Sequence, residues 1–126
     1  MGFYDDDNYG MEQTLHLFLD DDRAAGANAA AEQVARINFF NRVKVLQCRA
    51  IVCGTAFDEA DCSFTLLVDT TSFGSVDVST ATVAQVVDSD TYSQVIECTE
   101  GLVIQQASAT STGLCDFLVL YQQLFE

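Results

Sequence analysis

The sequence predicts a mainly β protein, an antiparallel β-sandwich or jelly-roll-like domain with an extended N-terminal arm and one short helix. Short segments of alternating apolar and polar residues recur along the chain, and Gly, Ser and Asp residues separate them. No βαβ rhythm is present, which favours two packed antiparallel sheets. With 126 residues, 49% of them hydrophobic, the chain is long enough to bury the core of one domain. We therefore expect an arm over residues 1–12 and a single domain over residues 13–126.

The N-terminal arm is predicted from its composition. Residues 1–12 combine the aromatic residues Phe3, Tyr4 and Tyr9 with a run of aspartates and with a glycine near each end. If such a terminal segment is ordered, it needs another surface to lie on. We therefore expect these three aromatic residues to contact a partner.

The next stretch predicts one strand followed by one helix. Over residues 14–19, leucines alternate with His16 and Phe18, which is the period of a strand. The acidic run at residues 20–22 then ends the strand. The alanine-rich stretch that follows has helical propensity, and we expect a short helix over residues 28–37.

A change in the alternation predicts a β-bulge in the next strand. Val43 and Val45 share one face, and the apolar positions then continue from Leu46 after a shift of one residue. An extra residue inserted into the strand is the simplest cause. The remaining pattern predicts turns at Gly74 and residues 88–90, and strand segments over residues 64–68, 76–78, 82–87, 93–98, 102–107 and 114–124.

The last of these strands is apolar on both faces, so we expect both faces to be covered. One face belongs to the core, and either the N-terminal segment or a neighbouring subunit covers the other. Self-association is therefore one of two alternatives. The first face holds Cys115, Phe117, Val119 and Tyr121, and the second holds Leu114, Leu118, Leu120 and Leu124.

The charges are separated along the chain. All five basic residues lie between positions 23 and 49, acids lie on both sides of them, and the formal net charge is −14. Such a chain repels phosphate groups, so we expect neither nucleic acid nor a membrane surface as partner. Recognition of a basic surface and solubility at high salt explain the acidity equally well. For Arg36, Arg42, Lys44 and Arg49, contact with an acidic partner and internal charge balance are alternatives, and we favour the second.

No residue pattern predicts an enzyme or a metal centre. His16 is the only histidine, and since the sequence places no partner beside it, we expect a partly buried strand histidine. The five cysteines are odd in number and lack CxxC spacing, which favours small buried hydrophobes over disulfides or zinc ligands. Acid runs at residues 20–22, 58–61 and 88–90 are expected to be solvated, with calcium binding as the alternative. We expect no catalytic residue and no cofactor.

Membrane insertion and secretion are not expected either. The chain has no run of about 18 apolar residues, the length that a transmembrane helix needs. Residues 1–7 lack the positive region and the apolar stretch of a signal peptide. The sequence therefore predicts a protein that is made in the cytoplasm and stays outside the bilayer.

Three stretches in the second part of the chain resemble a known group of proteins. They are residues 49–58 (RAIVCGTAFD), residues 64–74 (FTLLVDTTSFG) and residues 111–121 (STGLCDFLVLY). Their order resembles the small β-sandwich decoration or cement proteins on the capsids of tailed bacteriophages. The resemblance extends from about residue 49 to the end of the chain and rests on the order of features.

The resemblance implies a structural role on the outside of a virion. Such proteins bind at junctions between subunits of the major capsid protein, often as homotrimers, after synthesis in the host cytoplasm. The alternative is a calcium-assisted β-sandwich module that binds a receptor or a glycan. In either case we expect the partner contacts among aromatic residues and leucines: Phe3, Tyr4, Tyr9, Phe39, Phe40, Leu118, Leu120 and Leu124.

Overall fold

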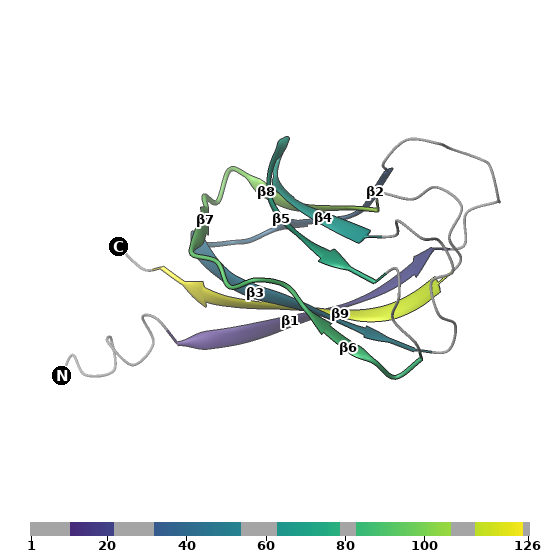
Figure 1. Cartoon of the computed structure of the whole chain (residues 1–126). Coiled ribbons are helices and arrows are strands. Elements are labelled where there is room, and N and C mark those ends of the chain that lie inside the picture. Colours follow the sequence, from purple (N-terminus) through teal and green to yellow (C-terminus); the bar gives the residue numbers. More distant parts are fainter. Residues whose placement is uncertain (1–10, 22–31, 54–62, 79–82, 107–112, 125–126) are drawn as a thin grey trace.

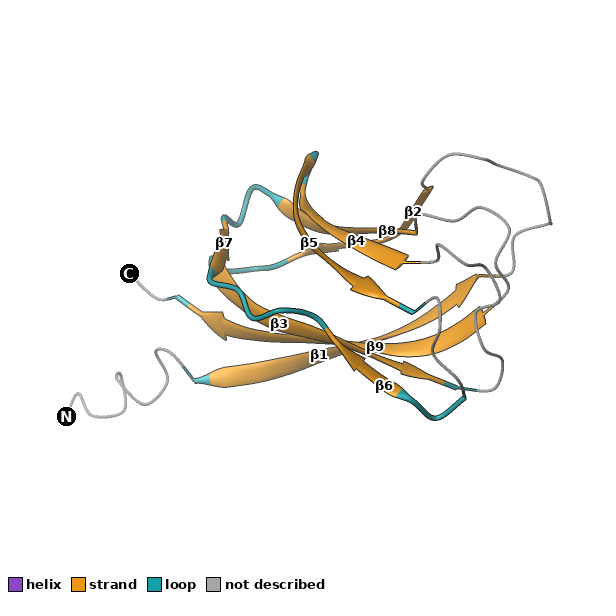
Figure 2. Ribbon diagram, in the orientation of Figure 1, coloured by secondary structure: helices purple, strands orange, loops and turns teal. Residues whose placement is uncertain are grey.

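The computed structural model describes residues 11–21, 32–53, 63–78, 83–106 and 113–124. Within these ranges the chain forms two antiparallel sheets that pack face to face, and no helix (Figures 1 and 2). The mainly β prediction is confirmed. Accordingly, the described residues contain no helix with the length and hydropathy to cross a bilayer. Most of the predicted arm, residues 1–10, lies outside the described residues.

The strands divide between a five-stranded sheet, sheet A, and a four-stranded sheet, sheet B. In sheet A, β9 is the neighbour of both β1 and β3, whereas β6 and β7 pair with opposite ends of β3. Sheet A contains β1 (Glu12–Asp21), β9 (Gly113–Gln123), β3 (Val43–Val52), β6 (Val86–Asp88) and β7 (Gln94–Ile96). Sheet B contains, in order, β2 (Glu32–Asn38), β8 (Gly101–Gln106), β4 (Ser63–Val68) and β5 (Thr71–Asp77).

The strand pairs are nested along the chain. β1 pairs with β9, β2 with β8, β3 with β6 and β7, and β4 with β5. A chain that folds as one long hairpin and rolls over two sheets in this way is a jelly roll. β6 and β7 together take the place of one edge strand. Of the two architectures that the sequence predicted, the described strands form the jelly roll.

The core lies between the two sheets and follows the predicted alternation. Phe117 of β9 contacts Phe64 of β4 edge to face, with ring centroids 5.7 Å apart, so the central aromatic contact joins the two sheets. Both rings are fully buried. The other fully buried side chains of the core include Val43, Val45, Val52, Leu66, Val76, Ile96, Leu102 and Ile104.

The predicted bulge is present in β3 and is confirmed at Leu46. The register between β3 and β9 shifts between Val45 and Gln47. On the other side of β3, the segment between β6 and β7 lies against the same level, because the amide of Tyr92 donates to the carbonyl of Leu46 at 2.6 Å. The bulge therefore interrupts the ladders on both sides of β3.

The predicted helix over residues 28–37 is wrong where the structure describes it. Residues 32–37 belong to β2, which pairs with β8. Side chains alternate in exposure from Ala35 to Asn38, as expected of a strand with one face on the core. Backbone pairing with β8 outweighs the helical propensity of alanine, which is a weak preference. Residues 28–31 lie outside the described residues.

The predicted turn at Gly74 is also wrong, because Gly74 lies within β5. The turn between β4 and β5 is made by Asp69, which has a positive φ of 53°, and Thr70. Gly74 is required for a different reason. The ring of Tyr92 occupies the place that a Cβ atom at this position would take. Tyr92 also packs edge to face on Phe73, so these contacts hold β5 of sheet B against the β6–β7 connection of sheet A.

Candidate interface on the solvent side of sheet A

Four rows of described side chains lie on the solvent side of sheet A, and we call these four rows the A face. Paired residues of neighbouring antiparallel strands place their side chains on the same side of the sheet, so the register defines each row. The rows are Glu12, Gln122, Lys44 and Val95; Thr14, Leu120 and Gln47; His16, Leu118, Arg49 and Asp88; and Phe18, Asp116, Ile51 and Val86.

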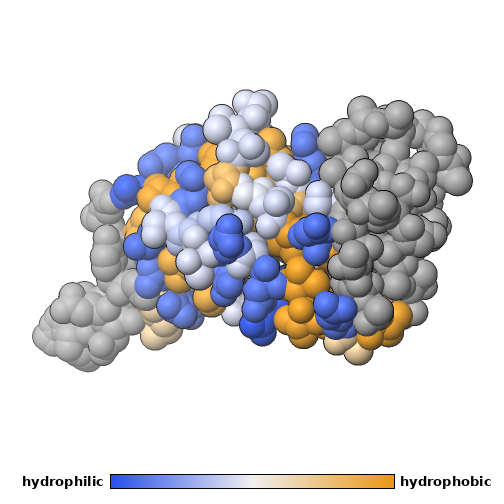
Figure 3. Space-filling model, in the orientation of Figure 1, coloured by the Kyte–Doolittle hydropathy of each residue, from blue (hydrophilic) through white to orange (hydrophobic). Residues whose placement is uncertain are grey.

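The A face exposes apolar side chains to solvent. Phe18 is 56% exposed and Val86 47%, whereas Ile51, Val95, Leu118 and Leu120 are half-buried. In Figure 3, apolar side chains reach the surface between hydrophilic ones on the lower side of the molecule, where sheet A lies in Figure 1. Single exposed apolar residues are ordinary, but six on one sheet face indicate a contact surface.

The solvent side of sheet B has a different composition. Thr65, Ser75 and Gln105 are among its side chains, and its apolar residues Leu67 and Val103 are buried. This is the usual pattern of an antiparallel sandwich, with the core on one side and polar groups on the other. The A face departs from this pattern, and sheet B does not.

A hollow lies in the middle of the A face. It is lined by Thr14 of β1, Leu118 and Leu120 of β9, and residues 47–49 of β3, and its volume is about 170 Å³. Residues 47–49 directly follow the bulge in β3, where the register to Leu120 shifts. An apolar cavity of about 150 Å³ holds a benzene molecule, so the hollow has the size of one aromatic or leucine side chain.

Two pairs of side chains on the A face contain charged groups. The Nε2 atom of His16 lies 2.7 Å from Oδ1 of Asp116. Arg49 donates two hydrogen bonds to Asp88, at 2.5 and 3.1 Å, in a bidentate pair. The guanidinium of Arg49 lowers the pKa of the Asp88 carboxyl and the carboxylate raises the pKa of Arg49. Asp88 and Asp116 therefore each have a side-chain partner on the same surface.

The same pairing occurs for the other arginines described. Arg36 donates to Asp69 at 2.8 Å, and Arg42 donates to Glu97 at 3.2 Å. With the Arg49–Asp88 pair, each of these three bases contacts an acid that follows it by more than thirty residues in the sequence. Internal charge balance, the favoured alternative for the basic segment, is therefore confirmed for the three arginines.

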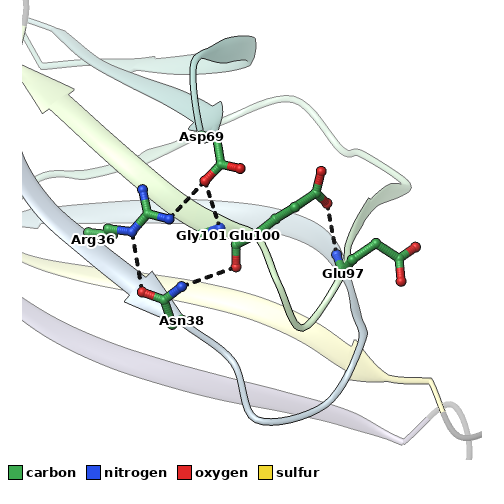
Figure 4. Close-up of polar contacts among 6 residues, drawn as sticks. All are labelled: Arg36, Asn38, Asp69, Glu97, Glu100 and Gly101. Carbon is green, nitrogen blue, oxygen red and sulfur yellow. Dashed lines mark hydrogen bonds and ion pairs between the residues drawn. The ribbon is translucent and has the colours of Figure 1, made fainter.

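The contacts of Arg36 form a second polar cluster, at one end of sheet B (Figure 4). Asp69 accepts hydrogen bonds from the Gly101 amide at 3.0 Å and from Arg36, and these contacts lower the pKa of its carboxyl. A Cβ atom on Gly101 would lie 2.6 Å from the guanidinium carbon of Arg36, so only glycine leaves the guanidinium in place. Asn38 extends the cluster through the carbonyl of Glu100. Its members hold β2 and two turns together, which is a structural task.

The structure does not bring the predicted contact residues together on one surface. Phe39 packs on the core and on Tyr121, with ring centroids 5.1 Å apart, so its main contacts are internal. Phe40, in contrast, is 95% exposed. Leu118 and Leu120 lie on the A face, and Leu124 follows β9, half-buried. Phe3, Tyr4 and Tyr9 lie outside the described residues.

Sequence reasoning missed several apolar members of the A face, among them Phe18, Ile51 and Val86. The alternation had already placed Phe18 opposite the leucines of its strand, so its exposure was available as a signal. The other two were not separable from core residues, because their exposure depends on the register between β3 and β6.

The prediction of a partly buried His16 is wrong, because its side chain is 58% exposed. Its strand alternates as expected, but His16 belongs to the row that faces solvent. Asp116 is the partner that the sequence did not reveal, since a hundred residues separate the two.

Metal ligands do not converge within the described residues. In these ranges no three His, Cys, Asp or Glu side chains are arranged to hold a metal ion. Asp88, from one of the acid runs, is bound by Arg49. Residues 58–61 and Asp22 lie outside the described residues.

No protein-family model, no curated protein and no solved structure matches this chain.

Proposed function

We propose that this chain is a non-enzymatic structural protein of a virion, which decorates the outside of a phage capsid and stabilises it by bridging neighbouring coat subunits as a homotrimer. The observation that carries the proposal is the A face. Six apolar side chains on the solvent side of a regular sheet suit a protein that works through protein contacts. The resemblance of residues 49–121 to capsid decoration proteins supplies the capsid as the setting.

The fold and the charges are consistent with this role. Jelly rolls occur in viral capsid proteins, but also in lectins and cupins, so the fold supports the proposal only by analogy. The net charge of −14 keeps a densely decorated particle soluble and disfavours nucleic acid and membranes as partners. Since Arg36, Arg42 and Arg49 are engaged with acids of the same chain, they are poorly placed to bind phosphate groups.

Attachment to the major capsid protein is assigned to the arm and to Phe40. The arm contributes Phe3, Tyr4 and Tyr9, and Phe40 projects from the connection between β2 and β3. A strap of this kind gains affinity from many copies on one particle. Removal of residues 1–10 leaves β1 complete, so the truncated protein should melt at the same temperature as the full chain. It should bind capsid particles more weakly. A truncated protein that fails to fold would place the arm in the domain itself.

The experiment that tests the proposed function is a copy-number measurement. Particles of the virus that encodes this chain are purified, and the chain is quantified against the major capsid protein by mass spectrometry with labelled standards. A fixed ratio near one copy per coat subunit is expected. A few copies per particle would indicate a vertex or tail component instead, and absence from particles would overturn the proposal.

A further inference from the structure

We infer that the A face is the contact between copies of this chain, with an apolar side chain of one copy seated in the hollow of its neighbour. The inference deepens the self-association in the proposed function and does not depend on the capsid. Three properties of the described residues support it, and each concerns a different kind of interaction.

The first property is the distribution of apolar surface. Phe18 and Val86 are about half exposed, and they stand in the same row as Ile51. Leu118 and Leu120 lie at the centre of the surface, where they line the hollow. Covering such side chains stabilises a complex by about 25 cal/mol for each Å² of apolar area removed from water. The solvent side of sheet B offers no comparable gain, because its two apolar side chains are already buried.

The second property is charge, and it selects a second copy as the occupant. Two chains of net charge −14 repel each other over most of their surfaces. The four rows of the A face, however, hold three acids (Glu12, Asp88 and Asp116) against two bases (Lys44 and Arg49) and His16. This surface is therefore within about one charge of neutral, so an equally acidic copy can approach it closely.

A strongly basic partner would not select this surface. Asp88 is neutralised by Arg49, and Asp116 is hydrogen-bonded to His16. A cationic partner gains more from the excess of acids over bases in the rest of the chain than from carboxylates that already have a partner. The charge pattern thus distinguishes a copy of this chain from a basic protein.

The third property is shape. The A face carries both a projecting ring, Phe18, and a hollow of about 170 Å³ one row away, lined in part by Leu118 and Leu120. Each copy can therefore give one side chain and receive one. In a twofold dimer, the two copies give a side chain to each other. In a ring, each copy gives a side chain to one neighbour and receives one from the other, and both arrangements are closed.

The test is the mass of the purified full chain by light scattering and sedimentation equilibrium across a range of concentrations. We expect an oligomer of two or three copies. Leu118→Asp places a charge beside the hollow and should give a monomer. Phe18→Ser leaves the core untouched, because Phe18 faces solvent, and should weaken association by about 10-fold or more, as expected for an aromatic anchor.

The matched control is Ser75→Asp, which adds the same charge to the solvent side of sheet B and should leave the mass unchanged. Circular dichroism establishes whether each variant is folded. If Leu118→Asp does not fold, Phe18→Ser alone tests the self-association. A monomeric wild type, or an oligomer that neither A-face variant weakens, would overturn the inference.

The two proposals fail separately. A monomer that still occurs in fixed ratio on particles would overturn the self-contact and the homotrimer, and would leave the decoration role. An oligomer that the A-face variants dissociate, but that is absent from particles, would do the reverse.

Discussion

Burial divides the cysteines of the described residues. Cys48 and Cys115 are fully buried in the core, whereas Cys98 is exposed in the turn between β7 and β8, and Cys53 is intermediate. Burial raises the pKa of the Cys48 thiol to about 12. Because the thiolate is the reactive form, a buried neutral thiol behaves as a small apolar side chain. The expectation of buried cysteines is therefore confirmed for two positions and wrong for Cys98.

Alkylation of the native protein should follow this division. With iodoacetamide at pH 8, Cys98 should be modified first, and Cys48 and Cys115 should react only after unfolding. Peptide mass spectrometry over time, with and without denaturant, gives the rates. Native modification of Cys48 as rapid as that of Cys98 would contradict its place in the core.

Asp69 combines a backbone task with an electrostatic one. Its φ of 53° lies in the left-handed region, which Asp and Asn tolerate better than other residues with a side chain. Its carboxylate accepts from the Gly101 amide and from Arg36, which lowers its pKa from the ordinary value of 3.8. A lowered pKa in the folded state means that the carboxylate stabilises the fold above its ordinary pKa, and that this contribution disappears as the pH falls through the folded value.

Asp69→Asn should therefore isolate the charge, since asparagine keeps both the size and the tolerance of positive φ. We expect the variant to melt below the wild type at pH 7, and the difference to shrink as the pH falls below about 4. Thermal melts from pH 7 to pH 2.5 measure it. Asp90→Asn, which removes an exposed charge without an ion pair among the described residues, controls for net charge. A difference that stays constant with pH would assign the effect to something other than the carboxylate.

At the scale of elements, the bulge in β3 organises its surroundings. It separates β6 from β7 and lets Tyr92 leave sheet A toward β5. The ring of Tyr92 then lies against Gly74. The extra residue in β3 thus allows Tyr92 to connect the edges of the two sheets.

Gly74→Ala should destabilise the protein by about 1–3 kcal/mol, because the added methyl group overlaps the ring of Tyr92 and forces it off Phe73. Chemical denaturation measures the change in free energy of unfolding. Gly74→Ala should destabilise the protein less in a Tyr92→Ala background than in the wild type, because the ring that the methyl group overlaps is then absent. Equal effects in both backgrounds would show that the contact is not the cause.

The elements that the sequence predicted are those with a local signal. The phase change between Val45 and Leu46 marked the bulge, and the alternation over residues 14–19 marked β1. β2 was missed because the alanine-rich stretch that leads into it favours a helix and only the distant β8 makes it a strand. Gly74 was read as a turn because the ring that requires a glycine belongs to Tyr92, which no local pattern connects to it.

The candidate site was predictable in part for the same reason. The two-faced pattern of the last strand identified Leu118 and Leu120 from the sequence alone. The hollow between them and β3, and the pairing of His16 with Asp116, depend on the register of strands that are far apart in the chain.

For the whole molecule, nineteen acids against five bases dominate the electrostatics. The described ion pairs are on the surface and are each worth little, whereas repulsion among the remaining acids acts over the whole fold. Salt screens both the attraction within the ion pairs and the repulsion among the acids. Because the repulsion is larger, its screening determines the change in stability. Salt should therefore stabilise this protein.

We expect the melting temperature to rise when sodium chloride is increased from 0.01 M to 1 M, which shortens the Debye length from about 30 Å to about 3 Å. Calcium and magnesium chloride at equal ionic strength provide the comparison. A stabilisation specific to calcium would favour the calcium-assisted binding module, since a bound ion stabilises the native state. A melting temperature that falls with salt would show that the ion pairs outweigh the repulsion.

The nesting of the strands also determines when the protein can fold. β9 lies between β1 and β3, yet it is the last strand along the chain. At about 5–20 residues per second, the ribosome makes β1 roughly 5–20 seconds before β9. During that interval two long strands lack the neighbour that joins them, and nascent chains on one message hold such edges close to each other. Sheet A therefore forms only after β9 has been made, and a slow decoding step before residue 113 would lower the yield of native protein without changing its sequence.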